Sequence, residues 1–190
     1  MAAMMGTLRT EPASQRPDLL AEPVREALAS WEHATEVLVA PIDPELADTA
    51  AFCEAYQVGL EVSANCVVVA GKREGAVRYA ACMVLATTRA DVNGVVRRLL
   101  DVRKASFAPM DTAVAETGMQ YGGITPIGLP PGWPIFVDAA VAGTPMVIVG
   151  SGIRGSKIAL PGKVLGDLPG AQVIEGLGTP AAPPPTVPAA

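Results

Sequence analysis

Short apolar runs separated by turn-forming residues dominate the hydrophobic pattern of this chain. Alternating or continuous apolar residues predict strands over 35–40, 65–70, 77–86, 104–108, 135–137, 146–149 and 157–160. The stretch 71–75 has glycine at both ends and charged residues between them, as hairpin loops do. The second and third of these strands are therefore expected to pair antiparallel.

Apolar residues at helical spacing predict helices over 18–32, 48–58, 91–100 and 111–116. Asp48 and Asp91 are the expected N-caps of two of them, and Gly59 and Gly118 are expected to end helices. Hairpin-linked strands alternate here with short helices and do not form a regular βαβ series. The pattern therefore predicts an α+β fold with an antiparallel or mixed sheet.

A chain of 190 residues, half of them hydrophobic, is long enough for one domain with a real core. We assign that domain to residues 18–177, beginning with the first predicted helix. Residues 1–17 are expected to form a loose, flexible leader, and residues 178–190, rich in Pro and Ala, an extended, disordered tail.

The formal net charge of −5 provides no overall positive field to attract polyanions. Tight binding of DNA or other nucleic acid without a local basic patch or a partner is therefore disfavoured. The apolar runs 66–70 and 80–86 are far shorter than the roughly 20 residues that span a bilayer, and residues 1–17 contain no apolar segment of signal-peptide length. We expect no membrane association and a cytoplasmic location.

The histidine and cysteine content limits the chemistry. Cys53, Cys66 and Cys82 form no CxxC pair, which disfavours a disulfide framework or a zinc site. His33 is the only histidine and lies near the first predicted helix, so a Ser-His-Asp or Cys-His arrangement has little support. Neither of the common phosphate-binding glycine motifs is present. No metal and no cofactor are expected.

Two glycine-rich segments remain as candidates for function. Gly122-Gly123-Ile124-Thr125-Pro126 interrupts a strand-like stretch, and Gly150-Ser151-Gly152-Ile153-Arg154-Gly155 follows a predicted strand. Glycine lets backbone approach a ligand closely and present main-chain N–H groups to it. A bulge or turn is the purely structural explanation of either segment.

Together with Asn65-Cys66-Val67-Val68 and Arg89-Ala90-Asp91, these segments resemble, in order, the YbaK/ProX family of aminoacyl-tRNA editing domains. The resemblance covers roughly 37–177. It implies a curved, barrel-like sheet flanked by short helices, and hydrolysis of the ester that joins a wrong amino acid to tRNA. Such an ester needs positioning, a water molecule and donors to the developing oxyanion more than it needs a strong base.

The resemblance implies a role for Asn65, which stands where the family usually carries a lysine. Asparagine supplies no charge but still donates and accepts hydrogen bonds, although it could also serve only the local backbone. Gly122, Gly123 and Pro126 match a Gly-x-x-x-Pro element that walls the amino-acid pocket. Thr125 is expected to orient water or the substrate amine, with a turn-stabilising hydroxyl as the alternative.

The second loop is expected to face this pocket through Gly150, Gly152 and Gly155. Arg154 is a candidate contact for a phosphate of the tRNA acceptor end, or else a solvated loop residue. Asp138 falls where the family often has an acidic residue, and Cys66 neighbours Asn65. The expected catalytic set is Asn65, Gly122, Gly123 and Thr125, and the expected substrate-binding set is Cys66, Pro126, Asp138, Gly150, Gly152, Arg154 and Gly155.

The leading hypothesis is a freestanding trans-editing hydrolase that clears a small amino acid from mischarged tRNA. Its expected partners are the aminoacyl-tRNA acceptor end and, as a further candidate, an aminoacyl-tRNA synthetase. The alternative is a binding module that holds aminoacyl-tRNA, a small amino-acid derivative or a synthetase without hydrolysis. A structural homologue with an unrelated small-molecule role is a third hypothesis.

Overall fold

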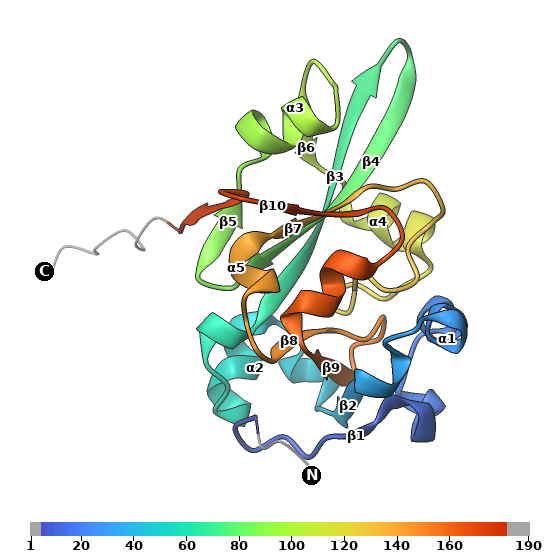
Figure 1. The fold of residues 1–190 in the computed structure, drawn as a ribbon, viewed down its shortest axis with the longest axis vertical. Helices are drawn as coiled ribbons and strands as arrows, with labels where there is room; N and C mark the ends of the chain where they lie inside the picture. The colour runs from blue at the N-terminus through green and yellow to red at the C-terminus, as the bar shows by residue number, and fades with distance from the viewer. Residues whose placement is uncertain (1–4, 182–190) are drawn as a thin grey trace, which may run out of the picture.

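Two β-sheets lie side by side in the computed structural model of this protein, which describes residues 5–181 (Figure 1). The smaller one is antiparallel throughout and has the strand order β1-β2-β9-β8. Its strands are β1 (Glu11–Pro12), β2 (Leu38–Pro41), β8 (Val147–Gly150) and β9 (Ser156–Leu160). Each strand is short because a proline or glycine stands at or next to one of its ends.

The larger sheet is mixed and has the order β10-β7-β4-β3-β6. Its strands are β3 (Ala64–Arg73), β4 (Ala76–Leu85), β6 (Ala105–Phe107), β7 (Ile135–Asp138) and β10 (Ala171–Ile174). The antiparallel pairing of β3 with β4 is confirmed, with Asn65 opposite Val84 and Arg73 opposite Ala76. Glu74 and Gly75 both have positive φ, so the hairpin closes through a two-residue turn and both strands run longer than the pattern predicted.

The α+β class is confirmed, whereas "barrel-like" describes the sheets only loosely. Within residues 5–181 the two main sheets remain separate and are linked by an isolated bridge between Ser63 and Ile148. The strand β7 runs parallel to both β4 and β10, which makes the larger sheet mixed. The sequence pattern did not reveal β10 or the small pair β5 (Thr88–Ala90) and β11 (Gly178–Pro180).

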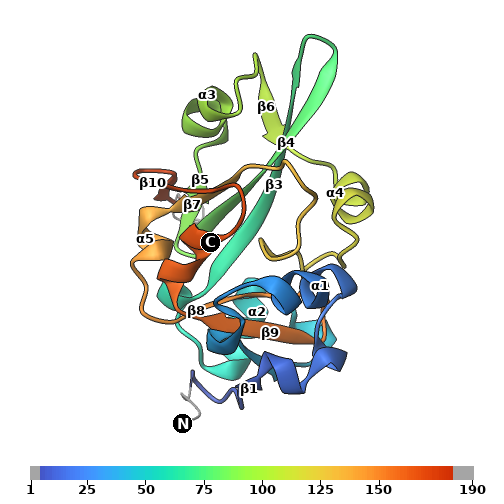
Figure 2. The same cartoon turned by 45° about the vertical axis from the view of Figure 1, so that its right-hand side comes forward.

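Short helices surround the sheets, as Figures 1 and 2 show. They are α1 (Glu22–Ser30), α2 (Thr49–Tyr56), α3 (Arg97–Leu99), α4 (Met110–Thr117) and α5 (Ala139–Ala142). Asp91 caps the helical turn that leads into α3, accepting from the N–H groups of Gly94 and Val95, as predicted. Gly118 ends α4 in the left-handed region, also as predicted.

Two predicted helix signals act differently in the structure. Asp48 stands at the N-cap of α2, but its side chain makes no capping hydrogen bond. Gln57, with φ of 54°, takes the left-handed position that ends α2, two residues before the predicted Gly59. Its N–H reaches the carbonyl of Cys53, so the backbone is satisfied without glycine.

The core fills the space between the sheets and under the helices. Val24 of α1, Val39 of β2, Met83 of β4 and Val137 of β7 belong to its largest cluster and are almost fully buried. A second cluster, which includes Val96 and Cys82, packs α3 and the turn before it against the larger sheet. Burying such apolar side chains contributes roughly 1.5–3 kcal/mol each, so the largest cluster holds the two sheets together.

The loose leader expected over residues 1–17 is wrong for the part that the structure describes. Leu8 and Ala13 are buried, and the N–H of Ala13 donates to the carbonyl of Val37. Their apolar side chains complete the edge of the core beside β2, which draws this segment onto the domain. Residues 1–4 lie outside the described part.

The predicted tail also begins later than residue 178. Gly178–Pro180 forms β11, paired with β5, so these residues belong to the domain. Residues 182–190 lie outside the described part of the chain. None of the helices in residues 5–181 combines the length and apolar character needed to cross a bilayer.

Candidate functional site

A small pocket lies where α2, the start of β3 and the smaller sheet meet. Its volume is about 230 Å³. The residues that line it are Ala47, Asp48, Thr49, Ala64, Asn65, Cys66, Tyr121, Gly122, Ile124, Gly150 and Lys157. It therefore gathers Asn65, Cys66, Gly122 and Gly150 from the predicted site, together with polar residues that the sequence had not singled out.

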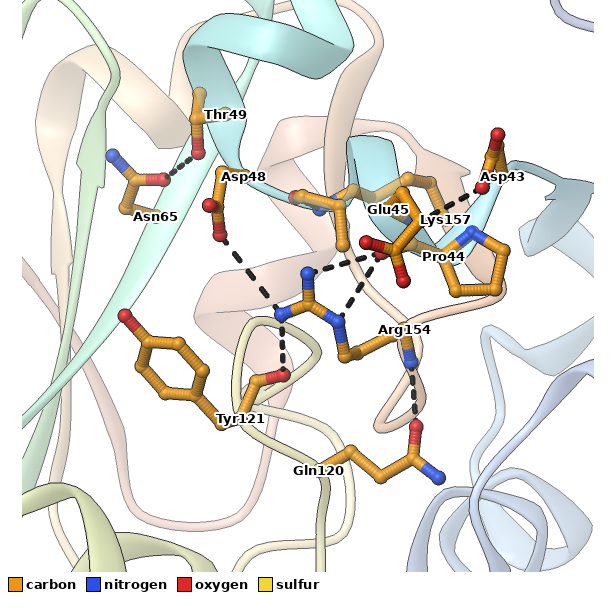
Figure 3. A network of polar contacts seen from close by, with 11 residues as sticks. Asp43, Pro44, Glu45, Asp48, Thr49, Asn65, Gln120, Tyr121, Arg154 and Lys157 are labelled. Carbon is orange, nitrogen blue, oxygen red and sulfur yellow. Dashed lines mark hydrogen bonds and ion pairs between the residues drawn. The ribbon is translucent and has the colours of Figure 1, made fainter.

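Asn65 is held in a defined orientation at this pocket. The hydroxyl of Thr49, the first residue of α2, donates to Oδ1 of Asn65 at 2.6 Å (Figure 3). Since the amide oxygen is occupied in this way, the Nδ2 amino group is the part of the side chain left to donate to a ligand. The hydrogen bond from Thr49 therefore fixes which end of the Asn65 amide is engaged by the protein.

Lys157 supplies a positive charge in the same pocket. It projects from β9, in which all five residues are buried, and is itself only 9% exposed. Its Nζ donates to the carbonyl of Ala47 at 3.0 Å and lies 5.3 Å from the centre of the Phe52 ring. An ammonium group has three donors, so hydrogen bonds remain available beyond the one to Ala47.

Burial lowers the pKa of Lys157 below its ordinary value because a desolvated ammonium is less stable than a hydrated one. The nearby groups act in both directions: Cys53 and Asp48 favour the charged form, and Arg154 opposes it. A buried lysine is rare unless it has a partner or a task. Within residues 5–181 the ammonium has one hydrogen-bond acceptor, the carbonyl of Ala47, and lies over one aromatic face, while Lys157 also lines the pocket.

Arg154 clamps the rim of the pocket. Its guanidinium donates to the carbonyls of Pro44, at 3.0 and 3.2 Å, and of Tyr121, at 3.2 Å, and lies 3.9 Å from the Asp48 carboxylate (Figure 3). The backbone N–H of Arg154 donates to Gln120. Arg154 therefore ties the segment before α2 to the loop after α4. This contrasts with the expected role as a free phosphate contact.

The two glycine-rich loops do face one another, and their backbones touch. The N–H of Gly152 donates to the carbonyl of Gly123 at 2.7 Å, and the N–H of Gly123 donates to Gln120. A side chain at Gly123 would place its Cβ 2.6 Å from the backbone of Ile153. The N–H of Gly123 is thus committed to the fold, and its glycine is required by close packing.

Several residues of the expected site lie elsewhere. Thr125 is fully buried, does not line the pocket and has an unpaired hydroxyl oxygen within the described part of the chain. Pro126 lines a different groove beside Trp133. Asp138 is buried at the start of α5, where its carboxylate accepts from the N–H groups of Ala140 and Gly178. Its position is explained by the packing of β11.

Gly152 and Gly155 also stay outside the pocket lining. Gly152 has φ of 87° and packs against Ala21, so it turns the loop after β8. The carbonyl of Gly155 accepts from the N–H of Ile42 and thereby extends the pairing of the smaller sheet. Both glycines shape the loop that carries Arg154.

Nucleophilic cysteine or histidine chemistry finds no support in this geometry. Burial raises the pKa of the Cys66 thiol well above its usual range, so the thiolate that would attack a substrate is disfavoured. His33 lies between Glu36, at 2.8 Å, and Asp167, at 3.1 Å, and does not line the pocket. Within residues 5–181, no three His, Cys, Asp or Glu side chains are grouped to hold a metal ion.

Lys157 and Thr49 line the pocket but were not predicted from the sequence, and Asp48 was predicted only as a helix cap. Lys157 carried a usable signal, because a lysine within the strand Ser-Lys-Ile-Ala-Leu is unusual for a run that is otherwise apolar and small. Thr49 and Asp48 carried no sequence signal for a site beyond that of a helix cap. Their place beside Asn65 depends on how α2 packs against β3.

The profile of the family described as "Aminoacyl-tRNA editing domain" matches residues 43–168, which include every residue that lines the pocket. The chain belongs to this family. No curated protein matches the chain.

Solved structures share the fold of this editing domain. A candidate trans-editing enzyme for prolyl-tRNA synthetase superposes with a TM-score of 0.68 at 22% identity, covering 82% of this chain and 94% of the other. A hypothetical protein, APE2540, superposes with a TM-score of 0.71 at 19% identity, covering 83% of this chain and 100% of the other. A scaffold protein from epitope-grafting design superposes with a TM-score of 0.69 at 22% identity, covering 82% of this chain and 95% of the other. At these identities the likeness concerns the fold.

The clamp can be tested by Arg154→Met, which keeps the aliphatic stem and removes the donors to Pro44 and Tyr121. We expect the free energy of unfolding to fall by about 1–3 kcal/mol, because two carbonyls lose a charged partner. Urea denaturation measures this change. Arg89→Met, at an exposed arginine, is the control and should change stability by less than about 0.5 kcal/mol. Equal stability of the parent and Arg154→Met would show that the arginine is not a clamp.

Proposed function

We propose that this editing domain hydrolyses the ester bond of aminoacyl-tRNA and that the pocket beside Asn65 receives the aminoacyl end. The observation that carries the proposal is the hydrogen bond from Thr49 to Asn65, which fixes an amide donor at the pocket. The family membership supports aminoacyl-tRNA as the substrate class. The chain would act in trans, on tRNA charged by a separate synthetase.

The polar groups of the pocket complement an α-aminoacyl ester. Such an ester presents an ammonium group at one end and a carbonyl oxygen close to it. Asp48 provides a carboxylate at the rim for the ammonium, while Asn65 and Lys157 provide donors for the carbonyl oxygen and the neighbouring ribose oxygens. One pocket thus contains both signs of charge that the substrate requires.

The proposed reaction needs only water and the substrate. A water molecule attacks the ester carbonyl carbon, the carbonyl electrons move onto oxygen, and the resulting oxyanion accepts hydrogen bonds from Asn65 and Lys157. Collapse of this intermediate breaks the bond to the ribose oxygen, which takes a proton. The products are free amino acid and tRNA with its terminal hydroxyl restored. Donors aimed at such an oxyanion typically accelerate ester chemistry by ~10²–10³-fold each.

The size of the pocket favours a small amino acid. Its volume of about 230 Å³ lies below the roughly 300–1,000 Å³ of sites for drug-sized ligands. Ala64 and Ile124 give it apolar surface. Exclusion of a larger side chain by such a wall is worth only about 1–3 kcal/mol per methylene, so we expect graded preference among small amino acids.

The activity is tested by measuring release of labelled amino acid from a panel of mischarged tRNAs. We expect the parent to release a small amino acid faster than the spontaneous rate, and Asn65→Asp to reduce kcat by roughly 10²-fold because an acceptor replaces the donor. Asn93→Asp makes the same change at an exposed position and should leave kcat unchanged. No release from any tRNA by the parent, with or without a synthetase, would contradict the proposal and favour a binding module.

The role of Lys157 predicts a pH dependence. Its ammonium is the binding form, and its lowered pKa means that the proton is lost at a pH below the ordinary lysine value of 10.5. The affinity of the parent for an unreactive amide-linked aminoacyl adenosine, relative to Lys157→Met, should therefore decrease as pH rises towards that value. Isothermal titration calorimetry over a pH series measures it. Lys163→Met, at an exposed lysine, is the control.

A constant affinity ratio between the parent and Lys157→Met across the pH series would contradict this role. So would an equal loss of affinity in Lys163→Met. Because Asp48, Cys53 and Arg154 influence Lys157, the titration is read from the difference between the parent and Lys157→Met and not from the parent alone.

A further inference from the structure

The charges of this acidic chain are unevenly distributed. Residues 71–104 contain eight of the 14 lysines and arginines but only three of the 19 aspartates and glutamates, a local charge of +5. The rest of the chain accordingly carries −10. Apart from Arg89, these basic residues belong to the β3–β4 hairpin, α3 and the short segment between α3 and β6, which lie together at one end of the molecule (Figures 1 and 2).

Most of this positive charge is not neutralised locally. Asp101 pairs with Arg73, at 3.4 Å, and Arg78, at 3.1 Å, and Glu74 lies near Arg73. Five other cations are exposed and have no carboxylate within ion-pair distance in the described part of the chain. They are Lys72, Arg97, Arg98, Arg103 and Lys104. This end of the molecule therefore presents solvated positive charge that the protein itself does not neutralise.

Three of these cations surround a hollow in the surface. A groove of about 460 Å³ is lined by Ala70, Gly71, Lys72, Val77, Arg103, Lys104 and Ser106. A second hollow, of about 390 Å³, adjoins it and shares Lys72 and Arg103. We call the first of these the basic groove. Lysine and arginine around a concave surface, with a hydroxyl beside them, suit phosphate oxygens.

We propose that the basic groove binds the phosphate backbone of the RNA whose aminoacyl end occupies the pocket. This inference rests on the proposed function for the identity of the RNA. A chain with net charge −5 would otherwise repel RNA, so a local surface must supply the attraction. Phe107, 61% exposed on β6 directly after Ser106, adds an aromatic face on which an unpaired base can stack.

The spacing along β3 fits such an arrangement. Asn65 lies near the beginning of this strand and Lys72 near its end, seven residues apart. At roughly 3.3 Å per residue, the pocket and the basic groove are about 23 Å apart. If the single-stranded acceptor end occupies the pocket, nucleotides further from that end would reach the hairpin. The strand thus acts as a rigid spacer between the reacting ester and the backbone contacts.

The test compares two triple variants with the same change in net charge. The first, Lys72→Gln with Arg103→Gln and Lys104→Gln, removes the cations of the basic groove. The second, Arg9→Gln with Arg25→Gln and Lys163→Gln, removes exposed cations elsewhere. Fluorescence anisotropy of uncharged tRNA transcript over a range of salt concentrations gives the affinity and its salt dependence.

We expect the groove variant to bind tRNA at least ~10-fold more weakly than the parent at low salt, and its slope of log affinity against log salt to be smaller by about 2–3, as loss of three phosphate contacts requires. The control variant should stay within ~2-fold of the parent. Equal weakening in both variants, or none in the groove variant, would overturn the proposal. Unchanged RNA binding with lost binding to an acidic synthetase would assign the surface to a protein and also overturn it.

A second readout separates this proposal from the proposed function. Hydrolysis of a short aminoacylated trinucleotide, which cannot reach the basic groove, should be unchanged in the groove variant, while KM for full-length aminoacyl-tRNA rises. If the parent hydrolyses neither substrate but the groove variant still loses tRNA affinity, the deacylase function fails and the RNA surface stands. If both substrates lose hydrolysis equally in the groove variant, the surface does not act through RNA and the inference fails.

Discussion

The backbone contact between the two glycine-rich loops is the constraint on which the site depends. Gly123 and Gly152 approach closely enough for a direct N–H to carbonyl bond, and a side chain at Gly123 would collide with the backbone of Ile153. This contact brings the segment after α4 against the smaller sheet and forms one wall of the pocket. Arg154 then fastens the same wall to the segment before α2. Gly123 and Gly152 therefore act by allowing close packing, and the donors that we propose for the ligand are the side chains of Asn65 and Lys157.

The positive charge of the pocket comes from a different strand than the family resemblance implies. The position where the resemblance led us to expect lysine holds Asn65, and a lysine on another strand, Lys157, reaches the same pocket. Desolvation makes this ammonium costly to bury, and its polar partners among residues 5–181 are one carbonyl and one aromatic ring. A costly charge at a pocket is easiest to understand if a ligand completes its interactions.

The fold was largely predictable because its elements are marked locally. The β3–β4 pairing followed from apolar runs on either side of a glycine-bounded charged loop, and the Asp91 cap followed from its place before an apolar helical stripe. The site was only partly predictable. Asn65, Gly122 and Gly150 line the pocket, but Pro126 and Asp138 were placed there by the family resemblance, and Thr125 by its position between matched residues.

Tertiary packing decided what the local pattern could not. Residues of a tight loop point in different directions, so Pro126 faces another groove only four residues after Gly122. Lys157 and Asn65 lie 92 residues apart, and they share a pocket because α2 and the two sheets converge on it. The positive end of the molecule is different, because the local charge of residues 71–104 reveals it and only the net charge of the whole chain averages it against an acidic remainder.

The central claim is that Asn65 and Lys157 hold the aminoacyl end in this pocket. Nuclear magnetic resonance of the side-chain amide of Asn65 and the ammonium of Lys157, during titration with an unreactive amide-linked aminoacyl adenosine, tests it most directly. We expect both signals to shift and to saturate with a single Kd. The proposed role of the two residues fails if the ligand binds while these two signals stay unmoved and the signals of the groove beside Trp133 shift instead.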